Sequence, residues 1–287
     1  MLTDITIQVL NALALSSILL LCSIGLTMIF GIMGVINFAH GSFYMLGAYV
    51  GFSIIKMSGS YWLALIISPL LVGLVGAFLE LTTLRFIYLR SHFYQLLLTF
   101  GFLLALDALA QTIWGTDFKE VPVPDLLKGS VHILGTMYPI YRLFMLGLTA
   151  GVTIGLVVCL QKTKIGISIR AVSQDSEMAA GIGINVNMVR TLVFGAGCAL
   201  AALGGVVIAP IVSGSLGMGV AILIQAFVVV VIGGLGSILG SVVGSLIVGT
   251  SQSYGTYLFP EGAMVFMYAM MAFILIFRTR GLFGEEE

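Results

Sequence analysis

Asn37 and His40 lie inside an apolar stretch, residues 5–55, that contains no lysine, arginine, aspartate or glutamate. An amide and an imidazole are costly in hydrocarbon, and intramembrane groups of this kind commonly line a path for a solute or ion. Gly31 and Gly34 precede them, and helices that break inside a membrane turn backbone N–H and C=O groups toward a small polar solute. The pattern predicts a substrate path with the candidate residues Asn37, His40, Gly41, Ser42 and Asp107.

Each ionisable residue within an apolar segment also has a structural interpretation. His40 by itself fits an interior histidine whose ring is hydrogen-bonded. Glu80 lies about one helical turn before Arg85 near a predicted membrane face, which favours an interfacial ion pair over a role in transport. Asp107 fits either a side chain that faces the bundle and pairs with a neighbour, or a group that takes part in transport, and both interpretations stay open.

A second glycine-broken stretch, VVVIGGLGSILGSVVGSLIVG, covers residues 229–249 in the other half of the chain. In a transporter, one such stretch in each half points to the substrate path. Close packing of small residues between helices, or a turn at a membrane face, explains the same glycines. The residues predicted to act as hinges or packing contacts are Gly31, Gly34, Gly233, Gly234 and Gly236.

The polar connection of residues 163–190 carries a different signal. Ser176 is predicted as the N-cap of a short helix, with Glu177 in its first turn and good helix formers after it. Gly181 and Gly183 are predicted to close this helix. A short amphipathic helix between two membrane segments is suited to dock into a groove on a cytoplasmic partner, and an ordinary solvated connector is the alternative.

The composition decides which solvent surrounds the fold. Of the 287 residues, 60% are hydrophobic and 8% charged, with a mean hydropathy of +1.17, whereas a soluble domain has about a quarter charged residues. The chain is therefore predicted to be an all-α, polytopic membrane helix bundle. The 12 basic and 12 acidic residues cancel, which argues against a nucleic-acid partner. The sequence has no P-loop, hydrolase motif or metal-ligand cluster, so we expect neither an enzyme nor a bound cofactor or metal.

Apolar runs long enough for membrane helices, and the basic residues between them, set the expected topology. The runs cover about 9–31, 36–55, 61–84, 92–114, 143–161, 190–212, 216–232, 238–256 and 263–278. Placing the basic residues of 85–90, 162–190 and 278–280 in the cytoplasm requires an outside N-terminus, a cytoplasmic C-terminus and an odd number of crossings. We expect eight or nine membrane segments, some broken by glycine and re-entrant, in one domain over residues 1–287.

Three regions resemble the most characteristic parts of LivH-type permeases, the inner-membrane subunits of bacterial branched-chain amino-acid ABC importers. They are GIMGVINFAHGSFYMLGAYV, TKIGISIRAVSQDSEMAAGIGINVNMVR and QAFVVVVIGGLGSILGSVVGSLIVG, and the similarity extends from about Ile18 to Gly281. Leu239 departs from the family pattern, which often has proline at this place.

The resemblance implies a permease that moves branched-chain or other apolar amino acids by alternating access. It implies four kinds of partner: a second related permease (LivM-like, or a second copy), two cytoplasmic ABC ATPases, a periplasmic solute-binding protein and the lipid bilayer. ATP hydrolysis is then expected on the partner chains. The ATPase contact implied for the 163–190 connector comprises Arg170, Asp175, Glu177, Ala179, Ala180 and Gly183.

Alternatives remain open at two levels. Urea, short amides or an aromatic acid are alternative solutes, because related permeases resemble one another across substrates. A gradient-driven carrier or channel, with Asp107 as its coupling group, and a membrane scaffold are alternatives of other classes. The glycine-broken polar stretches argue against a scaffold, which has no need of them.

Overall fold

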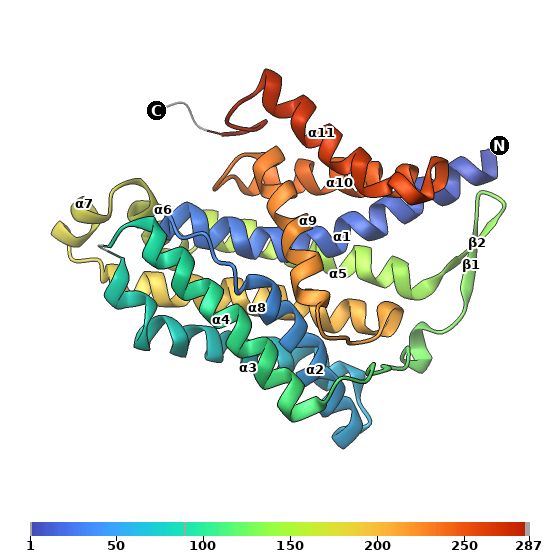
Figure 1. Ribbon diagram of the computed structural model, residues 1–287, viewed down its shortest axis with the longest axis horizontal. Helices are drawn as coiled ribbons and strands as arrows, with labels where there is room; N and C mark the ends of the chain where they lie inside the picture. The colour runs from blue at the N-terminus through green and yellow to red at the C-terminus, as the bar shows by residue number, and fades with distance from the viewer. Residues whose placement is uncertain (1, 89, 285–287) are drawn as a thin grey trace.

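The computed structural model describes residues 2–88 and 90–284, and helices make up most of it (Figure 1). The α-helices are α1 (Leu2–Met33), α2 (His40–Ser58), α3 (Tyr61–Thr82), α4 (His92–Trp114), α5 (Ile140–Lys162), α6 (Lys164–Gln174), α7 (Ser176–Gly181), α8 (Val186–Val212), α9 (Met218–Gly233), α10 (Ile238–Leu258) and α11 (Ala263–Phe277). The shorter elements are the 3-10 helices η1 (Leu84–Ile87), η2 (Asp125–Leu127) and η3 (Pro260–Gly262) and the antiparallel strands β1 (Ser130–Ile133) and β2 (Thr136–Pro139). The fold is the all-α membrane bundle that the sequence predicts, with one small hairpin between α4 and α5 in the described chain.

Five described helices are long and apolar enough to cross a membrane, namely α1, α3, α4, α5 and α8. The count rises to six if α9 and α10, which are bent by 118° at their junction, form one span. Every apolar run predicted from the sequence overlaps a helix. The five or six possible spans are nevertheless fewer than the eight or nine crossings predicted. The shorter helices account for part of the difference: α9 has 16 residues, or about 24 Å at 1.5 Å per residue, against a hydrocarbon core of about 30 Å.

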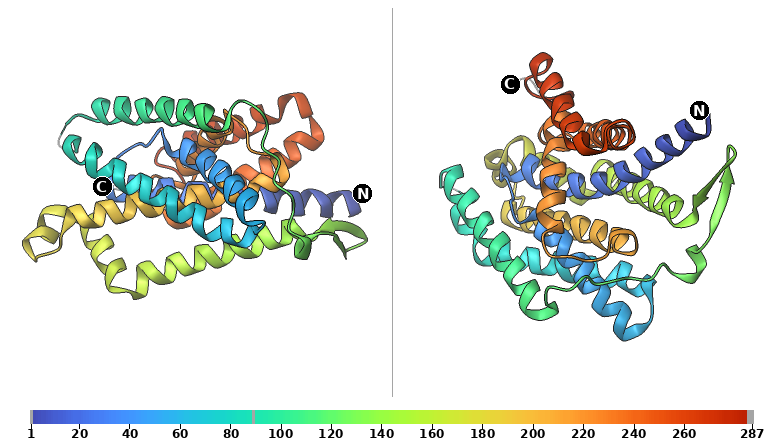
Figure 2. Two further views of the ribbon diagram at one scale, coloured as in Figure 1. Left: turned by 90° about the horizontal axis from the view of Figure 1, so that it is seen from below. Right: turned by 45° about the vertical axis from the view of Figure 1, so that its right-hand side comes forward.

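Helices α1 and α8 form the centre of the bundle. Within their most apolar windows 83% and 72% of the residues are buried, against 22% and 17% for α4 and α5, which lie on opposite sides of the bundle (Figure 2). The centre depends on close helix crossings. A Cβ on Gly47 of α2 would lie 2.2 Å from the Ala202 carbonyl oxygen of α8, and one on Gly205 of α8 would lie 1.9 Å from the Tyr44 carbonyl oxygen. Small residues therefore set the helix spacing here, as is usual in lipid.

One end of the bundle, called here the hairpin end, carries the start of α1 and the β hairpin (Figure 1). The Tyr138 hydroxyl of β2 donates a hydrogen bond of 2.8 Å to the Leu10 carbonyl of α1. Lys119, in the loop after α4, exchanges two backbone hydrogen bonds of 2.8 Å with Gly214 in the α8–α9 connection. The start of α1, the α4–α5 loop and the α8–α9 connection therefore share this end.

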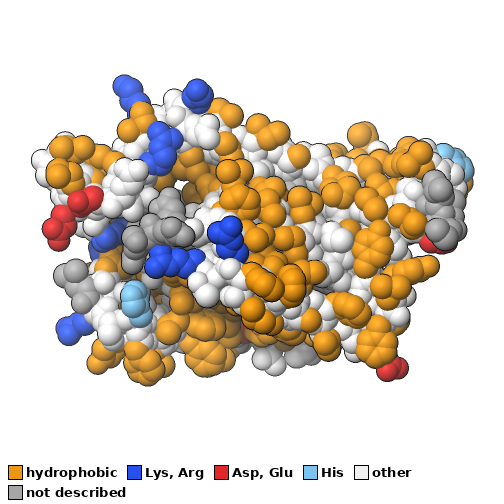
Figure 3. All heavy atoms as spheres, turned by 90° about the horizontal axis from the view of Figure 1, so that it is seen from above, with side chains coloured by type: hydrophobic (Ala, Val, Ile, Leu, Met, Phe, Trp, Pro, Cys, Tyr) orange, Lys and Arg blue, Asp and Glu red, His pale blue; other side chains and the backbone are white. Residues whose placement is uncertain are grey.

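The opposite end, called here the α7 end, carries the α5–α8 connector. A Cβ on Gly31, near the end of α1, would lie 3.1 Å from the Gly236 Cα in the α9–α10 turn. The Leu282 N–H donates to the Ile232 carbonyl at 2.9 Å, so the described C-terminal segment lies at the same end. Figure 3 shows that lysine and arginine gather toward this end on the face it displays, with hydrophobic side chains over the middle.

The short helix α7 begins at Ser176 as the sequence predicts, but its cap is a different residue. The Asp175 carboxylate accepts hydrogen bonds of 2.9 Å from the backbone N–H groups of both Glu177 and Met178. The prediction that Ser176 is the N-cap is therefore wrong. An aspartate caps a helix as well as a serine does and adds a negative charge at the positive end of the helix dipole.

Candidate functional site

The INFAHG stretch is a break in the helical structure inside the bundle. Helix α1 ends at Met33, Gly34 takes a left-handed conformation with φ of 63°, and α2 begins at His40. Figure 1 shows the intervening segment running back from the end of α1 toward the middle of the molecule. Val35 and Ala39 are fully buried, so the backbone polar groups of this segment must be satisfied within the protein.

Asn37 satisfies part of that requirement. Its Oδ1 accepts a hydrogen bond of 3.1 Å from the Ala39 N–H, and its carbonyl accepts one of 3.2 Å from the His40 N–H. The Thr99 hydroxyl of α4 lies 3.3 Å from the Ile36 carbonyl and donates to it. The Asn37 Nδ2 group is buried without a partner among the described residues. The asparagine therefore builds the start of α2 and leaves one donor unused.

His40 ties the same break to α1. Its Nε2 lies 2.9 Å from the Cys22 carbonyl oxygen. Since a carbonyl only accepts, Nε2 carries the hydrogen. The other ring nitrogen, Nδ1, is buried without a partner in the described part of the chain. Gly25 makes room for the ring, because a Cβ there would lie 3.0 Å from the His40 Cε1 atom.

Two further candidate path residues, Ser42 and Asp107, are brought together. The Ser42 hydroxyl donates to the Asp107 carboxylate at 2.8 Å, which joins α2 to α4. Gly41 lies at the crossing of α2 and α9, where a Cβ would be 2.0 Å from the Gly219 carbonyl oxygen. The sequence interpretation of Asp107 as a residue with a partner in the bundle agrees with this geometry.

Glu80 forms the ion pair expected from the sequence. Its carboxylate lies 3.7 Å from the Arg85 guanidinium and accepts hydrogen bonds from the hydroxyls of Tyr88, at 2.6 Å, and Thr191 of α8, at 2.5 Å. The carboxylate is fully buried. Burial and the neighbouring carboxylate raise the pKa of Tyr88 above its ordinary value, so this hydroxyl remains a donor. The cluster fixes the end of α3 to α8.

The two glycine-broken stretches meet at the α7 end. Gly31 of the first stretch contacts Gly236 of the second. Helices α1 and α10 are also joined by a hydrogen bond of 2.6 Å between the Thr27 and Ser241 hydroxyls. Gly234 and Gly236 have φ values of 102° and 87°, which glycine adopts without strain. Gly233 packs on Gly240, where a Cβ would lie 2.2 Å from the carbonyl oxygen. These glycines make a tight turn and a close helix contact.

The connector touches this meeting point. A cavity of about 300 Å³ lies between the end of α1, helix α6 and the α9–α10 turn, and Gly31, Arg170 and Gly236 all line it. The Arg170 guanidinium also donates to the Leu160 carbonyl at the end of α5. A residue predicted for ATPase coupling therefore lies beside one glycine from each of the two predicted hinge stretches.

Helix α7 protrudes from the bundle on a buried base. Ala179 is 2% exposed and packs in a cluster with Ile24 of α1 and Val189 of α8. The helix ends in a Schellman motif, in which the Ile184 N–H donates to the Ala179 carbonyl and the Gly183 N–H to the Ala180 carbonyl. Gly183 has the φ of 90° that this motif requires.

The outer face of α7 carries the remaining predicted contact residues. Asp175, Glu177 and Ala180 are exposed, whereas Ala179 faces inward. Met178 and Ile182 are 67% and 70% exposed and were missed from the sequence. The signal that could have found them is an apolar pair four residues apart on a polar connector.

Two open cavities, of about 510 and 640 Å³, lie toward the hairpin end. They share the lining residues Leu15, Ile18, Ile208 and Val212 and therefore adjoin. None of the predicted path residues lines either cavity. The sequence also gave no reason to single out Arg142, which lines the smaller one, because an arginine at the start of a membrane segment is ordinary.

An apolar helix bundle with breaks in its interior, open cavities and an exposed connector helix is the architecture of a membrane permease. The chain belongs to the family described as branched-chain amino acid transport system / permease component, whose model matches residues 8–275.

Relatives of known description cover almost the whole chain. The high-affinity branched-chain amino acid transport system permease protein BraD of Pseudomonas aeruginosa is 28% identical over 98% of this chain and 96% of its own. The corresponding LivH protein of Salmonella typhimurium is 30% identical over the same shares. The solved structure of PsaBC from Streptococcus pneumoniae in complex with Fab is similar with a TM-score of 0.49 and 14% identity, over 93% of this chain and 89% of that one.

Proposed function

We propose that this chain is the transmembrane subunit of an ABC importer for branched-chain or other apolar amino acids, in one permease domain over residues 1–287. Partner ATPases drive alternating access through the connector of residues 163–190. The observation that carries the proposal is the meeting of Gly31, Arg170 and Gly236 around one cavity, because a push on α6 and α7 then acts directly on both glycine-broken stretches.

The exposed surface of α7 and the family support a set of proposed partners. Two cytoplasmic ATPases, which hydrolyse ATP, receive the outer face of α7. A second permease, LivM-like or another copy of this chain, completes the membrane part, and a periplasmic binding protein delivers the solute. The names of the relatives, which specify branched-chain amino acid transport, support the choice of solute.

The orientation in the bacterial inner membrane places the N-terminus outside and the C-terminus in the cytoplasm. Arg85 donates to Thr191 near the start of α8, Arg170 is on α6, Arg190 is near the start of α8, and Arg278 precedes the C-terminal segment that bonds to the end of α9. These arginines therefore lie toward the α7 end, and cytoplasmic loops are rich in such residues. Successive helix connections alternate between the two ends, so that nine helices cross wholly or in part. Helix α2 and the bent α9–α10 pair are the partial or re-entrant members.

The path through the membrane passes near the INFAHG break. Asn37, His40 and Gly41 are packed rather than exposed, so in this proposal they set where the start of α2 lies beside the path, and α2 shifts together with them. Ser42 and Asp107 hold α2 against α4 during that motion. The unpaired Asn37 Nδ2 and His40 Nδ1 atoms have no hydrogen bond to lose when the segment shifts.

Reconstitution tests the proposal. The complete importer in liposomes is expected to accumulate leucine only when ATP and the partner ATPases are present, and to prefer leucine over urea and short amides. Uptake that survives removal of the ATPases but is lost in Asp107→Asn would instead identify a gradient-driven carrier. Asp117→Asn, in the exposed loop after α4, is the matched control. Preference for urea or an amide would support an ABC importer with a different solute.

A further inference from the structure

The two adjoining cavities at the hairpin end differ from the rest of the bundle in their charge. Among their described lining residues, Arg142 alone carries a formal charge. In the described chain no carboxylate forms an ion pair with it. An arginine at an open cavity of a membrane bundle, without an acidic partner among the described residues, provides a receptor for an anionic group.

The guanidinium is held in place by neutral groups. The Arg142 side chain donates to the Asn11 Oδ1 atom of α1, and its guanidinium carbon lies 5.9 Å from the centre of the Tyr138 ring. These contacts come from α1 and β2, while Arg142 itself is in the first turn of α5. Because arginine has five N–H donors in a planar fork, one bond to Asn11 leaves donors that can hold a carboxylate.

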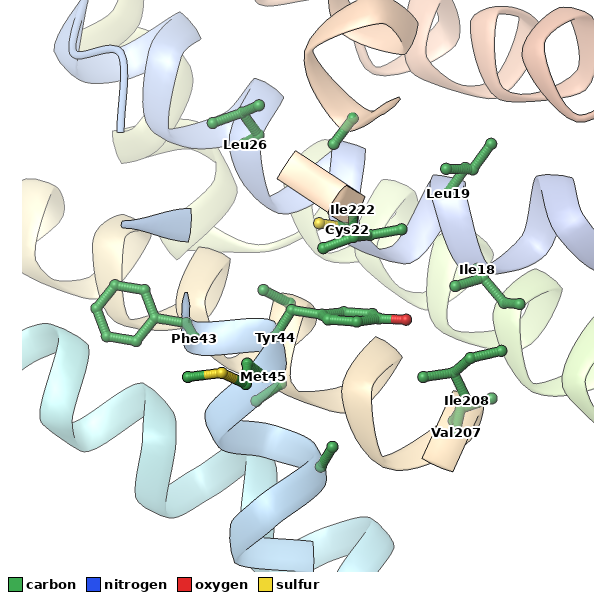
Figure 4. Packing of buried hydrophobic residues seen from close by; sticks show 14 of the residues in the cluster. Ile18, Leu19, Cys22, Leu26, Phe43, Tyr44, Met45, Val207, Ile208 and Ile222 are labelled. Carbon is green, nitrogen blue, oxygen red and sulfur yellow. The ribbon is translucent and has the colours of Figure 1, made fainter. Parts of the chain in front are cut away.

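The wall between the two cavities is apolar. It consists of Leu15 and Ile18 of α1 with Ile208 and Val212 of α8. Figure 4 shows the Tyr44 ring with its hydroxyl directed toward Ile18 and Ile208, and Tyr44 lines the larger cavity. The site therefore presents one cation beside an aliphatic surface, which matches an amino acid with an apolar side chain.

We infer that these cavities form one solute chamber, in which Arg142 receives the carboxylate of an apolar α-amino acid and the shared aliphatic wall receives its side chain. The inference rests on the proposed function and names its solute site. Gln8 and Ser253 line the smaller cavity, and the Ser253 hydroxyl donates to the Gln8 Oε1 atom at 2.9 Å. Their remaining acceptor lone pairs can receive hydrogen bonds from the ammonium group. Each cavity has the size usual for a small-molecule site, and the lack of a charged partner for the ammonium keeps binding weak enough for release.

Thiol protection tests the chamber in the importer complex of permeases and ATPases, without the binding protein, in lipid nanodiscs. Val212→Cys supplies the reporter, because Val212 is 56% exposed and lines both cavities. The native Cys22, Cys159 and Cys198 are replaced by alanine. Leucine is expected to slow labelling by a small charged thiol reagent, whereas leucinamide, which lacks the carboxylate, is not.

Arg142→Gln in that background is expected to raise the leucine concentration for half-protection by roughly ten- to a hundredfold, and to abolish the preference for leucine over leucinamide. Arg142→Lys retains the charge and should restore part of that preference. Lys128→Gln is the matched control, since Lys128 lies on the hairpin-end loop, 60% exposed and paired with Asp125.

Two results separate this inference from the proposed function. Leucine uptake by the unmodified complete importer, together with absent protection or equal protection by leucine and leucinamide, overturns the chamber and leaves the importer intact. Absence of ATP-dependent leucine uptake by the unmodified complete importer overturns the proposed solute and the chamber with it. Protection by leucine that Arg142→Gln weakens and Lys128→Gln does not establishes the site.

Discussion

At the scale of single residues, Asn37 and His40 show how a polar group can be kept in an apolar bundle. Each uses one atom for a bond that the helix break requires, to the Ala39 N–H and the Cys22 carbonyl. Each also leaves one buried atom unpaired, at about 1–3 kcal/mol per group. Such a cost is typical of sites where function, rather than stability alone, determines the residue.

His40→Ala is expected to slow uptake per inserted molecule several-fold and to destabilise the protein by about 2–3 kcal/mol, since it removes a hydrogen bond and leaves a void. Radiolabelled leucine uptake and thermal unfolding in detergent measure the two effects. His132→Ala, in the exposed strand β1, should change neither. If uptake falls only in proportion to the amount of inserted protein, His40 has a packing role alone.

At Gly41, the absence of a side chain allows the close crossing of α2 and α9. Gly41→Ala places a methyl group 2.0 Å from the Gly219 carbonyl oxygen, so α2 and α9 must separate. We expect a loss of about 1–3 kcal/mol from overpacking, seen as a lower melting temperature. Gly101→Ala of α4 has nothing within 4 Å of the new atom and should be neutral or slightly stabilising. Equal melting temperatures for the two variants would contradict the close crossing.

At the scale of elements, α6 and α7 form a projection with a buried base and an exposed tip, and the proposed ATPase contact uses that tip. The base is held by Ala179 in the cluster with α1 and α8, and by the bond from Arg170 to Leu160. The tip presents Glu177, with Met178 and Ile182 beside it. A rigid, capped helix transmits displacement better than a flexible loop, because fewer dihedral angles absorb the motion.

Charge reversal by Glu177→Lys is expected to lower ATP-driven uptake and copurification of the ATPases by roughly tenfold, as a like-charge contact costs at least about 1.4 kcal/mol. Glu120→Lys, exposed at the hairpin end, is the control. Arg170→Glu should have a larger effect, since it also releases α6 from α5. Normal copurification and uptake in the Glu177 variant would remove α7 from the ATPase contact.

At the scale of the whole molecule, the bundle is polar at its two ends and apolar at its periphery. The connector, the end of α1 and the described C-terminal segment share one end, and the start of α1 and the hairpin share the other. The proposed chamber opens toward the hairpin end, while the proposed ATPase contact lies at the α7 end. Such a separation is what alternating access requires, because delivery and energy then enter from opposite sides of the membrane.

Cysteine labelling tests the orientation of these ends. In a background without native cysteines, Glu120→Cys is expected to react with a membrane-impermeant reagent added outside, and Asp175→Cys only after the membrane is opened. Both positions are exposed, so accessibility does not depend on unfolding. Labelling in the reverse order would invert the topology and place the proposed chamber on the cytoplasmic side.

The sequence alone determined the class of protein, the apolar runs that overlap the described membrane helices and the Glu80–Arg85 ion pair. The predicted count of eight or nine crossings was not confirmed, since the described chain has five or six helices that could span a membrane. Composition and apolar runs are properties of the sequence itself, and Glu80 and Arg85 are only five residues apart. None of these features depends on how the helices face one another. The tertiary structure decided that His40 bonds the Cys22 carbonyl, that Asp175 rather than Ser176 caps α7, and that α1, α5, α8 and α10 enclose the cavity lined by Arg142. Those features depend on the rotation of each helix about its axis and on a competition between neighbouring caps, which only packing in three dimensions resolves.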